Sequence, residues 1–160
     1  MINNVYSITK QLTIMKKIFA LLVLALSIGS AHAFSGNDKV INKNQLPAQA
    51  QSFINEYFAG AKISYAKLET DFLVNSYEVM LADGTKLEFA SNGNWEDVDC
   101  RYGEVPAAII PAPIKDYVKA NYPDARVLKI ERDRRGYDLK LSNRLELKFN
   151  NDLEIVDIDD

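Results

Sequence analysis

Two stretches of the chain carry apolar residues at helical spacing. The apolar positions are Ala50, Phe53, Ile54, Tyr57 and Phe58 in the first stretch and Ile114, Tyr117, Val118 and Tyr122 in the second. Residues three and four apart lie on one face of a helix, so each stretch predicts an amphipathic helix. Pro47 suits the first turn of the first helix, and Pro111 or Pro113 that of the second, because a missing N–H loses no hydrogen bond there. Gly60 and Pro123 suit the helix ends.

A two-residue alternation of apolar and polar side chains follows each predicted helix. The alternating segments are 77–82, 86–89, 137–141 and 145–149. This period predicts antiparallel strands with one face on a core and the other face in water. Less regular strands are expected near 63–70 and 127–133. Turns are expected at 82–85 and 91–94, where Asp-Gly and Asn-Gly occur.

The pattern of one helix followed by strands occurs twice in the chain. Residues 46–69 resemble 110–131, with an offset of 64 between paired residues such as Pro47 and Pro111, and residues 77–99 align with 137–159 at an offset of 60. The sequence therefore predicts an α+β fold: two tandem helix-plus-four-strand antiparallel units that form one sheet, with both helices packed on one face. The expected divisions are a flexible lead-in at 34–44, repeat 1 at 45–100, a linker at 101–109 and repeat 2 at 110–160.

The first 33 residues have the pattern of an upstream extension followed by a cleaved signal peptide. Lys16 and Lys17 precede an apolar run from Ile18 to Ile28, which is short for a membrane span. The small residues of Ala31-His32-Ala33 then predict cleavage after Ala33, with translation starting at Met15. A transmembrane anchor is the alternative interpretation. The mature protein is expected in the periplasm or secreted, without a membrane span.

Removal of this leader changes the charge and the available chemistry. The chain has 19 basic and 22 acidic residues, and the leader holds three of the basic ones, so the mature net charge is −6. Such a charge argues against nucleic-acid binding. The only histidine also lies in the leader, which excludes histidine-based catalysis and histidine-ligated metals from the mature protein. The single cysteine cannot form an internal disulfide. We expect no enzymatic activity and no cofactor.

The motifs of the first copy resemble those of the PepSY-like family, which is also described as β-lactamase-inhibitor-like. The matching segments are Leu46–Ile54, Ala61–Ile63, Tyr77–Val79, Gly84–Phe89 and Asn92–Cys100. The second copy matches over 110–159, but Leu153 and Ile155 replace the Gly-x-Trp corner and no cysteine follows. The resemblance implies an exported protein of Bacteroidota-type bacteria that binds another protein. It implies no specific inhibition, because no inhibitory contact residue can be matched.

The stretch 89–100 concentrates acids next to the only tryptophan and the only cysteine. Glu96, Asp97 and Asp99 are a possible calcium site, but their spacing is unlike that of a calcium loop. The repeat places Asp157 and Asp159 at the equivalent positions, which favours a recurring, solvent-facing strand edge. We therefore predict no metal site.

Two residues of this stretch, Trp95 and Cys100, have no like-for-like partner in the second copy. Two interpretations are open for Trp95: it packs in the core, or it has a specific functional role. Two interpretations are also open for Cys100: its thiol is packed and inert, or it is reactive. This corner is thus a candidate special site.

Two further groups of residues are candidates for binding. The insertion 70–76 carries Phe72, Leu73 and Val74 near a predicted hairpin tip, where apolar residues often mark a contact surface. The polar face of the predicted sheet carries Glu78, Met80, Lys86, Glu88, Asp138, Lys140, Glu146 and Lys148. Each group also has a non-functional interpretation. The hairpin can pack on the neighbouring copy, and the polar face can be exposed to solvent without binding anything.

The sequence thus favours a non-enzymatic periplasmic module that recognises an unknown protein or peptide of the cell envelope through the open sheet face. The alternative is an envelope domain that senses a small ligand or a cation. The excess of acidic residues suggests this alternative.

Overall fold

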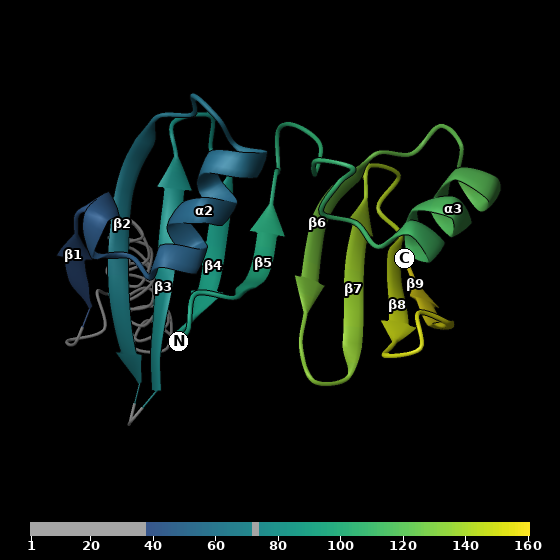
Figure 1. The fold of residues 1–160 in the computed structure, drawn as a ribbon. Coiled ribbons are helices and arrows are strands. Elements are labelled where there is room, and N and C mark those ends of the chain that lie inside the picture. Colours follow the sequence, from purple (N-terminus) through teal and green to yellow (C-terminus); the bar gives the residue numbers. More distant parts are fainter. Residues whose placement is uncertain (1–37, 72–73) are drawn as a thin grey trace, which may run out of the picture. The chain divides into compact units, whose positions relative to one another are not determined.

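The sheet of the structure runs through nine strands in chain order, and each neighbouring pair is antiparallel (Figure 1). The computed structural model describes residues 38–71 and 74–160. The strands are β1 (Lys39–Ile41), β2 (Ile63–Asp71), β3 (Val74–Leu81), β4 (Lys86–Ala90), β5 (Trp95–Asp99), β6 (Val127–Arg132), β7 (Gly136–Leu141), β8 (Glu146–Asn150) and β9 (Ile155–Asp159). The helices are α2 (Ala48–Tyr57) and α3 (Ala112–Asn121), and a 3-10 turn spans Lys43–Gln45.

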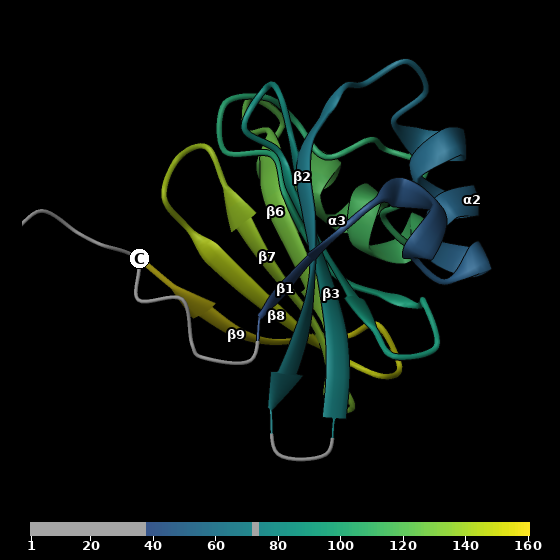
Figure 2. The same ribbon diagram turned by 90° about the vertical axis from the view of Figure 1, so that its left-hand side faces the viewer.

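Both helices lie on the same side of the sheet, and the core forms between them and the strands (Figure 2). The alternate strand residues that face the helices, such as Leu87 and Leu147, are fully buried. The rings of Phe53 and Phe89 meet edge to face with their centroids 5.7 Å apart, and those of Tyr117 and Phe149 do so at 5.5 Å. The predicted α+β fold, with one antiparallel sheet and two helices, is confirmed.

Of the predicted flexible lead-in at 34–44, the structure describes residues 38–44, and this part contains a strand. Its residues 39–41 form β1, which pairs with β2 at the edge of the sheet, and the 3-10 turn follows at once. Ile41 is buried against the core, whereas Val40 on the other side of the strand is exposed. A strand with one buried side chain shows no alternation in the sequence, which explains why it was not predicted.

Several expectations fall on residues outside the described part of the chain. These are the leader with its cleavage site after Ala33, and the tip residues Phe72 and Leu73. Within residues 38–71 and 74–160, no helix has the length and apolar character needed to cross a membrane.

Two turns at equivalent positions show how the halves of the sheet differ. Gly84 in the β3–β4 turn has a φ of 89°, and Arg144 in the β7–β8 turn has a φ of 78°. The hydrogen bonds correspond: Gly84 N donates to Leu81 O, and Arg144 N donates to Leu141 O, both at 3.1 Å. A left-handed backbone suits glycine but costs a non-glycine residue free energy, so Arg144 holds its turn under strain.

We therefore expect Arg144→Gly to raise the free energy of unfolding by about 1 kcal/mol, because relief of this strain outweighs the added freedom of the unfolded chain. Arg144 is exposed, so its side chain adds little to packing. Urea denaturation at pH 7 measures the change. Arg144→Ala is the matched control, because it removes the same side chain but keeps a Cβ in the left-handed region. An equal gain from alanine and glycine would contradict the explanation by strain.

Candidate functional site

The face of the sheet away from the helices carries two rows of mostly charged residues that run across the strands. Directly paired residues of antiparallel strands point to the same side, so the strand register defines each row. The acidic row, from β2 to β9, consists of Lys67, Glu78, Glu88, Asp97, Glu131, Asp138, Lys148 and Asp157. The second row, from β3 to β9, consists of Met80, Lys86, Asp99, Lys129, Lys140, Glu146 and Asp159. We call these two rows the open face.

Carboxylates outnumber lysines on the open face by nine to five. The five consecutive strands β3 to β7 each place a carboxylate in the acidic row. Every lysine is already in an ion pair; Lys67 Nζ, for example, lies 3.4 Å from a carboxylate oxygen of Glu78, and Lys140 Nζ lies 2.7 Å from one of Glu146. The open face therefore has an excess of negative charge that its own lysines do not balance.

Asp97 at the centre of the acidic row is the most constrained of these carboxylates. Its Oδ2 lies 3.2 Å from Lys129 Nζ and 3.8 Å from Lys86 Nζ. Its Oδ1 is buried and has no hydrogen-bond partner among the described residues, and only 5% of the residue is exposed. Burial raises the pKa of Asp97 to about 6, although Lys129 opposes the shift. The protein thus maintains a charged group at a position where its charge is unfavourable.

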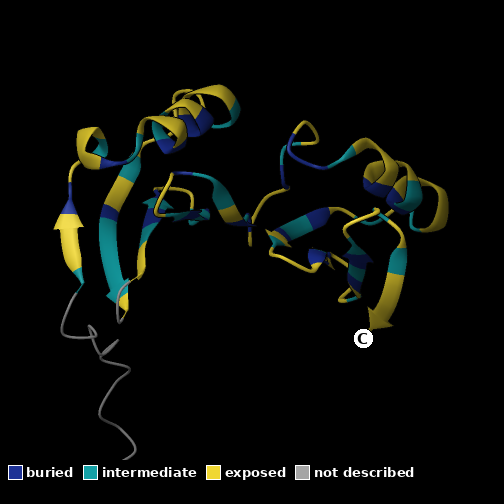
Figure 3. Ribbon diagram, turned by 60° about the horizontal axis from the view of Figure 1, so that its bottom comes forward, coloured by how far each residue is buried: buried dark blue, intermediate teal, exposed yellow. Residues whose placement is uncertain are grey.

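The burial of Asp97 corrects the prediction of a solvent-facing strand edge. Asp157, its equivalent in the second half, does face solvent, and its ion pair with Lys148 lowers its pKa. The difference has a simple cause: β5 is flanked by β4 and β6, whereas β9 is the last strand and is largely exposed near the C-terminus (Figure 3). The same sequence motif therefore has two environments.

The structure brings all eight predicted sheet-face residues together on the open face. Glu78, Glu88, Asp138 and Lys148 belong to the acidic row, and Met80, Lys86, Lys140 and Glu146 belong to the second row. A hollow of about 160 Å³ over β6, β7 and β8 has both rows in its lining. Val74, at the start of β3, is 68% exposed.

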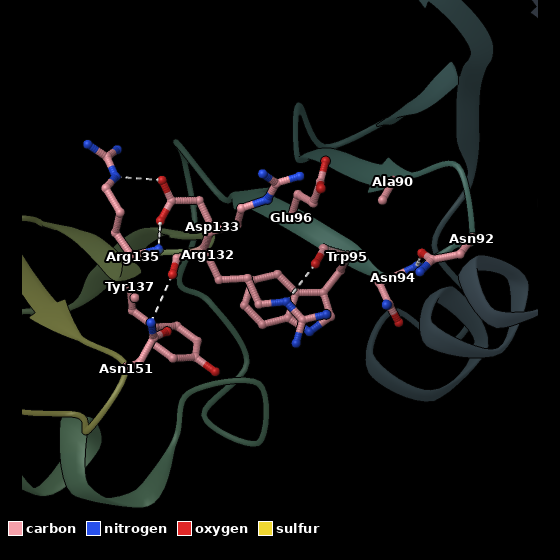
Figure 4. Close-up of a pocket in the computed structure, with 12 residues that line it drawn as sticks. Ala90, Asn92, Asn94, Trp95, Glu96, Arg132, Asp133, Arg135, Tyr137 and Asn151 are labelled. Atoms are coloured by element: carbon pink, nitrogen blue, oxygen red, sulfur yellow. Dashed lines mark hydrogen bonds and ion pairs between the residues drawn. The ribbon is translucent and has the colours of Figure 1, made fainter. Parts of the chain in front are cut away.

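Trp95 does not reach the open face, because it lies on the helix side of β5 next to a cleft (Figure 4). Its ring stacks on Phe53 with centroids 6.1 Å apart. The guanidinium carbon of Arg132 lies 4.3 Å from the centre of the Trp95 ring, and Arg132 Nε donates a hydrogen bond of 2.8 Å to the Trp95 carbonyl. Sequence reasoning missed Arg132, whose only signal is that it aligns with an apolar residue, Leu68, at the offset of 64.

Cys100 is separate from this cleft and is buried at the end of β5. Burial raises the pKa of its thiol to about 11, which leaves little reactive thiolate at neutral pH. Within the described residues, no three His, Cys, Asp or Glu side chains are placed to hold one metal ion.

Comparisons with known proteins identify the family. The model of a family described as "Putative beta-lactamase-inhibitor-like, PepSY-like" matches residues 75–157, just over half of the chain. The chain belongs to this PepSY-like family. The family description names an inhibitor-like protein rather than an enzyme. A search of the curated proteins found no match.

Three solved structures that are similar to this chain come from Bacteroides species. A "putative periplasmic protein" of the DUF2874 family from Bacteroides vulgatus is 48% identical, with a TM-score of 0.77 and coverage of 79% of this chain and 99% of that one. A "putative calcium-regulated periplasmic protein" from Bacteroides thetaiotaomicron is 54% identical, with a TM-score of 0.76 and coverage of 77% and 97%. A third protein, of unknown function and also from B. vulgatus, is 42% identical, with a TM-score of 0.74 and coverage of 78% and 100%.

The raised pKa of Asp97 predicts a pH dependence of stability. The native state holds the Asp97 proton more tightly than the unfolded state, in which an aspartate titrates near 3.8. The Asp97 contribution to stability therefore falls as pH rises from about 4 to 6 and stays low above that. We expect Asp97→Asn to remove this fall and to raise the free energy of unfolding at pH 7.5 by the order of 1 kcal/mol.

Denaturation of both proteins at pH 4, 5, 6 and 7.5 measures this difference. Asp157→Asn is the matched control with the opposite sign, because its pKa is lowered in the native state and its loss removes a favourable ion pair. A lower stability of Asp97→Asn than of the wild type at pH 7.5 would show that the Lys129 and Lys86 contacts outweigh the burial of the charge.

Proposed function

We propose that this protein is a non-enzymatic periplasmic binding module that holds a positively charged segment of a protein or peptide against its open face. The excess of carboxylates across β3 to β7 supports this proposal most directly. Complementary charge steers such partners together and selects among them. The description of two Bacteroides relatives as periplasmic proteins supports the periplasmic location, as does the signal-peptide pattern that ends at Ala33.

The state of the individual carboxylates supports a cationic partner further. Asp99 and Asp138 have no ion pair among the described residues, and Asp97 has one free oxygen. Burial and the neighbouring Glu131 raise the pKa of Asp138, so an added positive charge near it would be favourable. The hollow over β6 to β8 offers a lysine or arginine side chain of the partner a place beside this carboxylate.

The proposal also includes two statements about how the binding surface is built. We interpret the two helix-plus-four-strand segments as tandem copies whose joined sheets lengthen the acidic row. Val74 lies on the same side of β3 as Glu78 and adds an exposed apolar contact next to the charged rows. In this proposal Phe72 and Leu73 also contribute apolar contacts to the partner. This part of the proposal rests on the sequence alone.

A pair of charge-matched peptides tests the function. We expect a nonapeptide of alternating lysine and serine to bind in calorimetry at low ionic strength, and the same peptide with glutamate in place of lysine to give no heat. The double variant Glu88→Gln/Asp138→Asn should weaken binding by about fivefold, since each exposed pair contributes a fraction of a kcal/mol. Binding should also weaken in 0.5 M salt.

The control variant is Glu104→Gln/Asp116→Asn, which changes the net charge equally but outside the open face. Its affinity for the lysine peptide should equal that of the wild type. An equal loss in both double variants would mean that net charge alone attracts the peptide, and this result would reject the open face as the site.

A second candidate function is cation sensing. One relative is described as calcium-regulated, and calcium prefers the carboxylate ligands that the acidic row presents. The described residues hold no ready group of three such ligands, so calcium would have to draw neighbouring carboxylates of the row together. Titration with CaCl₂ tests this candidate: heat of binding and a rise in melting temperature that are both absent from Asp97→Asn support it. Their absence from the wild type rejects it.

A further inference from the structure

A cleft of about 830 Å³ lies on the helix side of the sheet, between the β4–β5 turn and the β6–β7 turn. Its lining includes Trp95, Arg132 and Tyr137, together with the amide side chains of Asn92, Asn94 and Asn151 (Figure 4). A volume of this size is typical of small-molecule sites, which combine an aromatic wall with a few fixed polar groups. The cleft shares no residue with the two rows of the open face, so its function is a separate question.

Arg132 in this cleft is held by Trp95 but has no ion pair among the described residues. The hydrogen bond to the Trp95 carbonyl and the stacking on the Trp95 ring hold the guanidinium in one place. Among the described residues no carboxylate lies within ion-pair distance of it, and its two terminal nitrogens donate no hydrogen bond. A half-buried, fixed and uncompensated guanidinium presents two parallel N–H donors, the geometry that matches a carboxylate.

The other charged residues of the lining do not neutralise Arg132. Asp133 accepts hydrogen bonds of 2.7 Å from the backbone N and 2.9 Å from Nε of Arg135, so these two charges compensate each other. Arg134 and Glu96 are exposed and carry opposite charges. The lining thus has one net positive charge, centred on Arg132, in a mature chain whose net charge is −6.

The equivalent positions of the other copy show that packing alone does not require this arrangement. Arg132 pairs with Tyr137 as Leu68 pairs with Tyr77, and Ile155 stands where the first copy has Trp95. Leucine and isoleucine therefore satisfy the same fold. The arginine and the tryptophan occur together only where β5 meets β6, which is where the cleft opens.

We propose that this cleft binds a small molecule that bears a carboxylate, with the Arg132 guanidinium as its anchor. Asn94 is placed to help: its Oδ1 accepts a hydrogen bond of 2.6 Å from Gln49 Nε2, which directs its amide oxygen to helix α2 and leaves the Nδ2 donor for a ligand. The carboxylate can come from the C-terminus of a short peptide or from a sugar acid. In both cases the group that binds to Arg132 is a carboxylate.

The fluorescence of Trp95, the only tryptophan of the chain, reports binding directly, because Arg132 lies against its ring. We expect a saturable fluorescence change with acetyl-Gly-Ala-Ala that has a free carboxylate, or with glucuronate. The C-terminal amide of the same peptide, and glucose, should give none. A response to either carboxylate supports the site and identifies the source. Equal responses to a carboxylate and its neutral counterpart, or no response to any probe, overturn it.

Two variants of Arg132 complete the test. Arg132→Leu introduces the residue that the first copy carries, and Arg132→Gln keeps a donor for the Trp95 carbonyl but removes the charge. Each should weaken carboxylate binding by at least about tenfold, as the loss of a charge-assisted bidentate contact implies. Arg101→Leu, an arginine outside the cleft, should bind as the wild type does. Wild-type affinity in a folded Arg132 variant would overturn the proposal.

Discussion

The pairing of β5 with β6 is the interaction on which the rest of this structure depends. It joins two segments that would otherwise end in exposed edges, and the hydrogen bonds from Cys100 N to Leu128 O and from Val105 N to Val127 O continue the join beyond the C-terminal end of β5. The register Asp97↔Glu131 then aligns the acidic row on one side of the sheet. On the other side the same join brings Arg132 against Trp95. Both candidate sites follow from this one pair of strands.

Burial at this join gives Asp97 its unusual state. A carboxylate on an edge strand, such as Asp157, keeps water on one side and its lysine partner on the other. At the centre of the sheet the neighbouring strands exclude water, while two lysines supply contacts to one oxygen only. Desolvation then outweighs attraction, which is why the pKa rises although two positive charges are near. A fold selected for stability alone has no need of this charge, and that imbalance favours a binding role for the open face.

Local periodicity predicted the helices, most strands and the outward-facing residues, because each of these features depends on neighbours in the sequence. The eight candidate residues of the sheet face are on the same side for this reason. Features that depend on distant neighbours were not predicted. Arg132 and Trp95 are 37 residues apart and meet only through the β5–β6 register. Strand β1 has one buried side chain, too few for a periodic signal.

The significance of a difference between two aligned positions of the chain therefore depends on where those positions lie in the sheet. Arg144 and Leu153 occupy positive-φ positions that align with Gly84 and Gly93, which also have positive φ, and each lies in a turn between consecutive strands. At Gly93 a Cβ would come within 2.7 Å of Pro47 Cβ, so the glycine allows the β4–β5 turn to approach helix α2 closely. The approach of this turn brings Asn94 within hydrogen-bond distance of Gln49 and places Trp95 against Phe53. The glycine thus shapes the wall on which Arg132 rests, whereas Leu153 lies in the β8–β9 turn at the far edge of the sheet.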